Sequence, residues 1–212
     1  MQQFPYAKKQ NSDNNTELCD LFYKYLSDKS PQIFHSYSPE YFNLLQNTKY
    51  TAKNILEIGI GNKQLMESIS GPDYVHGASL KAWRDFFPNA NIYGLDIDNS
   101  TLFQEERIKC FYTDQSKEIE LEKSINEILK DNQNQKFDLI IDDGSHYEDH
   151  MILTFFYLHK YLNTNGIYII EDIKSHEIPR FASLKIDEIS CEIIKIHQGQ
   201  GYWDGFIAYK KI

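Results

Sequence analysis

Acidic residues follow two apolar runs at the points where each run ends. One run is followed by Asp143, and another by the pair Glu171 and Asp172. If the runs are neighbouring parallel strands, these three carboxylates meet at one edge of a sheet. Carboxylates that close repel one another and have raised pKa values unless a cation lies between them. Mg²⁺ prefers octahedral oxygen ligands, so we predict that Asp143, Glu171 and Asp172 bind a divalent metal, with coordination positions left for substrate hydroxyls.

A histidine three residues beyond Asp143 adds acid–base chemistry. A metal lowers the pKa of a hydroxyl bound to it, and the imidazole of His146 can accept that proton near neutral pH. The segment from His146 to His150 matches neither the HExxH nor the HxxEH order of zinc proteases, so we interpret His146 as a general base. The alternatives are a histidine that packs or caps a helix N-terminus and solvated loop carboxylates.

Small and acidic residues after an earlier strand indicate a cofactor site. Glu57, Gly59 and Gly61 lie in one predicted strand-to-helix turn, where glycine lets the backbone approach a ligand. A dinucleotide fingerprint needs a third glycine at the position of Gln64, so a ligand without a pyrophosphate is favoured. The acidic start of the loop suits a cofactor that carries ammonium and sulfonium charges. An ordinary turn with two glycines is the alternative.

Polar side chains after the next two strands extend this predicted site. Asp96 and Asp98 are placed to accept hydrogen bonds from ribose hydroxyls. Asp114 and Gln115 follow the third strand and could contact an adenine ring, although Asp114 is equally consistent with a solvated loop.

Composition excludes several classes of protein. With 212 residues and a net charge of −9, the chain is expected to have one core and not to bind nucleic acid. It has no apolar run of membrane-spanning length and no signal-peptide pattern, so we expect a soluble cytoplasmic protein. Cys19, Cys110 and Cys191 form no metal-binding or disulfide pattern, and a homo-oligomer is compatible with the sequence.

Short apolar runs alternate with amphipathic segments, which predicts an α/β fold with a mostly parallel sheet and helices on both faces. A tail and helical cap are expected in residues 1–49, with helical segments at 18–26 and 38–46, ahead of a single main domain over 50–212. A further helix is predicted over 148–162. The predicted strands are 54–58, 90–95, 108–112, 137–141 and 166–170, followed by an antiparallel hairpin of 191–197 and 205–211.

Residues 77–98, 114–116, 141–146 and 170–172 resemble the macrolide-sugar O-methyltransferases of the mycinamicin type, and related enzymes of polysaccharide and antibiotic pathways. The resemblance covers roughly residues 50–175. It implies a Rossmann-like class I S-adenosylmethionine-dependent methyltransferase with a seven-stranded, mostly parallel sheet. It also implies Mg²⁺ on Asp143, Glu171 and Asp172, with His146 as the base.

The same resemblance adds Ser79 and Asp142 to the cofactor-binding residues, and we expect Trp83 to pack its helix against the sheet. It implies a sugar hydroxyl as acceptor, in a nucleotide sugar, glycoside or polysaccharide precursor. A catechol-type O-methyltransferase and a catalytically silent cofactor-binding scaffold are the alternatives. Four aromatic residues could line an acceptor pocket, although core packing is preferred for each: Tyr37, Tyr41, Tyr147 and Trp203.

Overall fold

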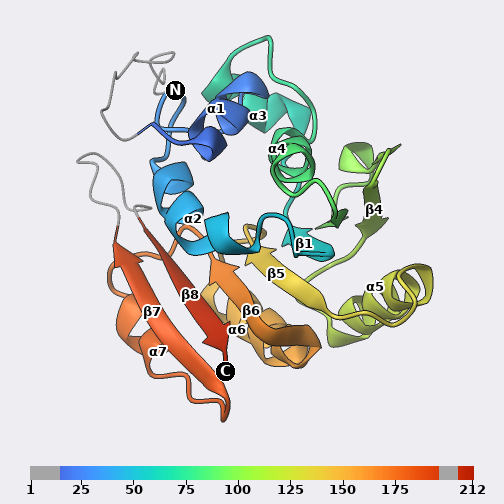
Figure 1. Cartoon of the computed structure of the whole chain (residues 1–212), viewed down its shortest axis with the longest axis vertical. Coiled ribbons are helices and arrows are strands. Elements are labelled where there is room, and N and C mark those ends of the chain that lie inside the picture. The colour runs from blue at the N-terminus through green and yellow to red at the C-terminus, as the bar shows by residue number, and fades with distance from the viewer. Residues whose placement is uncertain (1–14, 196–204) are drawn as a thin grey trace.

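A mixed eight-stranded sheet lies at the centre of the computed structural model, which describes residues 15–195 and 205–212 (Figure 1). Its order is β3 (Gln104–Glu105), β4 (Ile108–Tyr112), β2 (Asn91–Asp96), β1 (Asn54–Ile58), β5 (Phe137–Asp142), β6 (Leu162–Ile170), β8 (Gly205–Lys211) and β7 (Ile189–Lys195). The central strands β4, β2, β1, β5 and β6 pair in parallel, whereas β3, β8 and β7 pair antiparallel to their neighbours. The chain order reverses between β1 and β5, so a ligand crevice is expected at their carboxyl ends.

The five predicted parallel strands and the C-terminal hairpin are confirmed, with shifts at their ends. The expected sheet of seven strands has an eighth, β3, because a two-residue strand has no apolar period to detect. The helix predicted over 148–162 ends at Leu158 and is followed by a 3₁₀ turn, His159–Tyr161. β6 therefore begins at Leu162, where it pairs with Phe137 of β5. The turn predicted between the hairpin strands, with Trp203, lies outside the described residues.

Seven α-helices in the described ranges cover the sheet: α1 (Glu17–Lys24), α2 (Tyr37–Leu45), α3 (Lys63–Ser70), α4 (Ala78–Phe86), α5 (Glu118–Asp131), α6 (Glu148–Leu158) and α7 (Ile178–Ala182). Helices α1, α2 and α4 pack on one face of the sheet, and α5, α6 and α7 pack on the other. The side chain of Thr16 caps α1, and that of Asn62 caps α3. None of the helices in these ranges is both long and apolar enough to cross a bilayer.

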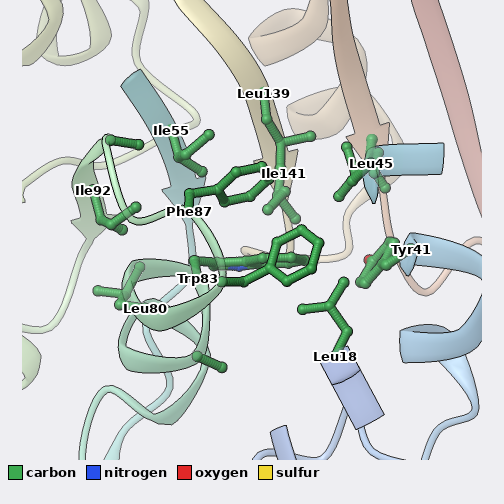
Figure 2. Close-up of a cluster of buried hydrophobic side chains, with 14 of the residues drawn as sticks. Leu18, Tyr41, Leu45, Ile55, Leu80, Trp83, Phe87, Ile92, Leu139 and Ile141 are labelled. Atoms are coloured by element: carbon green, nitrogen blue, oxygen red, sulfur yellow. The ribbon is translucent and has the colours of Figure 1, made fainter. Parts of the chain in front are cut away.

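Trp83 is the centre of the core beneath α1, α2 and α4. Figure 2 shows Leu18 and Tyr41 pointing toward its indole ring, with Ile141 on the sheet side. Phe22 meets the ring edge-on, with ring centroids 4.9 Å apart. The expected packing role of Trp83 is therefore confirmed, and this core fixes the two N-terminal helices against the ends of β1, β5 and β6.

The turn after β1 passes against the turn after β5 without space for a side chain. Gly59 has φ of +90°, and a Cβ there would lie 2.0 Å from the backbone oxygen of Asp143. Only glycine adopts this conformation freely and allows this approach. The two turns that carry the predicted site residues are therefore held in mutual contact by Gly59.

We expect Gly59→Ala to lower the free energy of unfolding by about 3 kcal/mol, since it combines an unfavourable φ with a backbone collision. Urea denaturation followed by circular dichroism measures this loss. Gly71→Ala is the matched control, because Gly71 has φ of 95° at the end of α3, away from the contact between these turns. Equal losses in the two variants would contradict the importance of the collision.

Candidate active site

Three carboxylates point to the same face of the sheet because they share its period of two. In β1, β5 and β6, the residue two positions before Glu57, Asp143 or Glu171 belongs to the core beneath α1, α2 and α4. Side chains two positions apart along a strand point to the same side. The three adjacent strands thus deliver three acidic groups to one location under the N-terminal helices.

The ammonium group of Lys29 lies among these carboxylates. Lys29 comes from the segment between α1 and α2, and only 1% of its surface is exposed. Its Nζ lies 2.5 Å from Oδ2 of Asp143, 2.7 Å from Oε2 of Glu171 and 3.9 Å from Oε1 of Glu57. Burial alone would lower the pKa of Lys29, but these neighbours, with Asp143 first, raise it well above its usual value. Lys29 is therefore a buried cation.

Two buried tyrosines from α2 complete the contacts. The hydroxyl of Tyr37 donates a hydrogen bond to Oδ1 of Asp172 at 2.5 Å, and the hydroxyl of Tyr41 donates to Oε1 of Glu171. Burial raises the pKa of both phenols, so they remain donors. The ring of His35 stacks on Tyr37 at 4.6 Å, and its Nε2 lies 3.8 Å from Asp172. Both oxygens of Glu171 are thus engaged, by Tyr41 and Lys29.

Asp143, His146 and Asp172 converge on the other side of this cluster. The Nε2 atom of His146 lies 3.8 Å from Oδ1 of Asp143 and 3.9 Å from Oδ2 of Asp172. One ligand atom from each of the three residues lies within 4.8 Å of the others. His146 and Asp172 both have φ of 54°, which is uncommon for residues other than glycine. Such strain is found at functional sites that the surrounding structure holds in place.

This donor set fits a hard divalent cation. The carboxylate oxygens of Asp143 and Asp172 leave coordination positions open on the cavity side, and the imidazole of His146 lies beside them. Burial, and then the charge of Asp143, raises the pKa of Glu171 well above its usual value, and burial also raises the pKa of Asp172. A divalent cation would oppose both shifts. Coordination by Glu171 stays a prediction, and it would require an oxygen that Lys29 or Tyr41 now contacts.

A cavity of about 550 Å³ opens beside this cluster and extends to the cofactor residues predicted from the sequence. Its walls include ten of the predicted site residues: Gly59, Gly61, Ser79, Asp96, Asp98, Asp114, Gln115, Asp143, His146 and Asp172. The sequence analysis therefore identified two groups of residues that the fold joins in one cavity.

Glu57, Asp142 and Glu171 are buried behind the cavity wall. Glu57 accepts a hydrogen bond from Nε1 of Trp83 at 2.6 Å, and burial raises its pKa to about 7 although Lys29 opposes this. Burial raises the pKa of Asp142 to about 6, with Gln115 acting against the shift through a hydrogen bond to Oδ1 at 3.0 Å. These contacts indicate that Glu57 and Asp142 support the site from beneath.

Asp96 organises the cofactor side of the cavity. Its two oxygens accept hydrogen bonds from the backbone nitrogens of Ile60 and Asp98, both at 2.8 Å. Asp98 accepts from the nitrogen of Ser100 and lies at the cavity wall. Asp114 accepts a hydrogen bond from Ser116 and forms an ion pair with Lys117. These two contacts, the Ser116 hydrogen bond most strongly, lower the pKa of Asp114 to about 2. Asp98 and Asp114 thus present charged oxygens to a ligand.

The sequence analysis did not identify Lys29 and His35, and it favoured a packing role for Tyr37 and Tyr41. The two tyrosines do pack in the core, but their hydroxyls contact the acidic cluster. The signal that could have indicated these residues is the shared period-two position of the strand-end carboxylates. Carboxylates gathered on one buried face require a cation or hydrogen-bond donors from the covering helices.

Curated relatives match most of this chain but less than half of their own length. Demethylmacrocin O-methyltransferase of Streptomyces fradiae is 32% identical over 165 residues, 78% of this chain and 38% of that protein. L-olivosyl-oleandolide 3-O-methyltransferase of Streptomyces antibioticus is 34% identical over 161 residues, 75% of this chain and 38% of the relative. No family model matches the chain.

Solved structures agree with this similarity. MycE methyltransferase from the mycinamycin biosynthetic pathway, in complex with Mg and SAH, superposes with a TM-score of 0.66 at 25% identity, over 93% of this chain and 55% of that one. A putative ribosomal RNA methyltransferase from Plasmodium falciparum has a TM-score of 0.52 at 15% identity, over 81% of this chain and 91% of that one. The expected methyltransferase fold is confirmed.

The raised pKa of Glu57 predicts a pH-dependent stability. The folded state holds the Glu57 proton up to about pH 7, whereas the unfolded chain releases it near 4.5, so stability falls as pH rises between these values. The side chain of Gln in Glu57→Gln can still accept the hydrogen bond from Trp83. As pH rises from 4.5 to 8, we expect the free energy of unfolding of this variant to increase by about 3 kcal/mol relative to that of the original chain. Urea denaturation in EDTA measures the difference. Glu122→Gln, at an exposed position of α5, is the control, and a pH-independent difference for Glu57→Gln would refute the shift.

Proposed function

We propose that this chain, which is related to the S-adenosylmethionine-dependent macrolide sugar O-methyltransferases, methylates a sugar hydroxyl with the help of a divalent metal. The observation that carries the proposal is the convergence of Asp143, His146 and Asp172 at one end of a cavity whose other end holds the cofactor residues. A methyl donor and an acceptor hydroxyl bound at these two ends would meet in the cavity. The chain spans only 38% of the length of two such enzymes, so its activity and its acceptor are proposals.

S-adenosylmethionine is assigned to the end of the cavity formed by the turns after β1, β2 and β4. Gly59 and Gly61 leave room for the methionyl part, while Asp98 can accept hydrogen bonds from ribose hydroxyls and Asp114 lies where the adenine is expected. Asp96 would act mainly by fixing the two turns that surround the ribose. The bound cofactor supplies an electrophilic methyl group on a positively charged sulfur.

Asp143 and Asp172 would hold the metal, with Glu171 as the further ligand predicted from the sequence. A bound divalent metal supplies Lewis-acid polarisation of an oxygen and lowers the pKa of a coordinated hydroxyl. His146 takes the proton of the acceptor hydroxyl at Nε2, and the acceptor oxygen forms its new bond to the methyl carbon as the carbon–sulfur bond breaks. The methylated acceptor, S-adenosylhomocysteine and a protonated His146 are then the products. The protein mainly contributes the alignment of oxygen, methyl and sulfur.

The acceptor end has apolar faces as well as charge. Phe34 and Tyr147 line the cavity and are 44% and 67% exposed. Aromatic faces of this kind suit the C–H side of a sugar ring, while its hydroxyls turn toward Asp143 and Asp172. This favours a glycoside or nucleotide sugar in which neighbouring hydroxyls can bind one metal.

The cofactor assignment is tested by calorimetric titration with S-adenosylhomocysteine, in Mg²⁺ and again in EDTA. We expect a dissociation constant in the micromolar range in both conditions, because the residues around the cofactor do not depend on the metal. Absence of binding in both would refute the proposed function.

The base assignment is tested with His146→Ala. We expect kcat to fall by about 10²- to 10⁴-fold, while the affinity for S-adenosylhomocysteine is retained, because His146 acts on the acceptor proton. Methyl transfer from labelled cofactor to a panel of nucleotide sugars and glycosides supplies the assay. His159→Ala, in the 3₁₀ turn after α6, is the matched control. An unchanged kcat in His146→Ala would exclude this residue as the base.

A further inference from the structure

Lys29 takes no part in the proposed chemistry, although its charge is buried within the site. Among the described residues that line the cavity, it is the one lysine or arginine. Its ammonium contacts Asp143 and Glu171 directly, and Glu57 lies at 3.9 Å. A charge buried this deeply is retained only when its partners offset the loss of hydration.

Acidic side chains outnumber basic ones around Lys29. Five carboxylates lie at the ends of the three central strands or just beyond them: Glu57, Asp142, Asp143, Glu171 and Asp172. Lys29 is the one lysine or arginine among the described residues that line the cavity, and it directly contacts only Asp143 and Glu171 of this group. A divalent cation and Lys29 would therefore act on the same group of carboxylates.

Asp143 connects the two positive charges. Its Oδ2 atom contacts Lys29, and its Oδ1 atom faces His146 within the candidate metal site. A metal bound at Oδ1 of Asp143 and the ammonium group of Lys29 at Oδ2 would thus lie on opposite sides of the same carboxylate. Two like charges that share one carboxylate in a poorly hydrated site repel each other.

We propose that Lys29 is a positioning residue that acts as the permanent counter-cation of the site: it holds Asp143 and Glu171 in place when no metal is bound, and its charge lowers the affinity of the site for a divalent metal. The proposal rests on the proposed function only in taking Asp143 as a metal ligand. The Lys29 charge and a bound metal oppose each other, and this coupling is reciprocal. A metal must therefore stabilise the folded chain more when the Lys29 charge is absent.

Loss of a counter-cation and loss of a lysine that only packs the site would change the metal affinity in opposite directions. Loss of a packing residue would disorder Asp143 and weaken metal binding. Loss of a counter-cation destabilises the metal-free chain, because the buried Glu171 and the partly buried Asp143 lose their partner, and at the same time strengthens metal binding. The direction of the change in metal affinity therefore separates the two roles.

The experiment uses the full chain without cofactor and compares the original protein with Lys29→Met. Mn²⁺ is titrated by electron paramagnetic resonance, and thermal unfolding is recorded in EDTA and in excess Mn²⁺. In Lys29→Met we expect Tm in EDTA to fall by about 10 °C. We also expect at least about tenfold tighter Mn²⁺ binding and a larger rise of Tm on adding Mn²⁺ than in the original chain.

Two further variants isolate the charge. Lys81→Met removes a lysine outside the cavity, whose Nζ lies 3.1 Å from Oε1 of Glu105. This variant should leave the Mn²⁺ affinity unchanged. Lys29→Met combined with Glu171→Gln removes the ammonium together with the acidic group of a carboxyl that it contacts, and should return Tm and Mn²⁺ affinity toward the original values.

Unchanged or weaker Mn²⁺ binding in Lys29→Met would overturn the proposal, and so would an original chain that binds no Mn²⁺. If Lys29→Met does not fold in EDTA, the proposal requires that it fold in excess Mn²⁺ or with Glu171→Gln; failure of both overturns it. Titration with S-adenosylhomocysteine in EDTA is independent of these outcomes, so failure of the methyltransferase proposal is recognised separately.

Discussion

The contact of the buried Lys29 ammonium with Asp143 and Glu171 is the interaction on which the arrangement of the site depends. The sheet brings acidic side chains to the same place because they share one face of adjacent strands, and nothing in the sheet itself neutralises them. The partners come from the N-terminal part of the described chain: Lys29 lies between α1 and α2, and Tyr37 and Tyr41 donate their hydroxyls from α2. The N-terminal helices are thus part of the site and not only a cover over it.

Close backbone packing fixes the other half of the geometry. Gly59 touches the backbone of Asp143, and a Cβ on Gly144 would lie 2.0 Å from Oε1 of Gln115. Gln115 in turn donates to Asp142 and accepts from the backbone nitrogen of Ser145. The turn that carries Asp143 and His146 is therefore held from three sides, which allows the left-handed conformation of His146 to persist.

The sequence was sufficient for the parallel strands, because their buried apolar runs are continuous, and for most cavity residues, because these follow strand ends. It was insufficient for Lys29, since a lysine in a polar segment carries no sign of burial in its neighbours. The cofactor-binding role expected of Glu57 stays a prediction, and its side chain lies beside Trp83 behind the cavity wall. Left-handed turns at His146 and Asp172 depend on tertiary contacts that no local pattern encodes.

The hydrogen bonds between the N-terminal segment and the strand ends join residues far apart in the chain. Lys29 and Asp143 are separated by 114 positions, and Lys29 and Glu171 by 142. During synthesis the helices α1 and α2 emerge before the strands of the sheet, yet their polar partners exist only once β6 has been made. Since contacts of such long range form late, the lysine and the two tyrosines are expected to join the site at the end of folding. An intact acidic cluster would then report a completely folded chain.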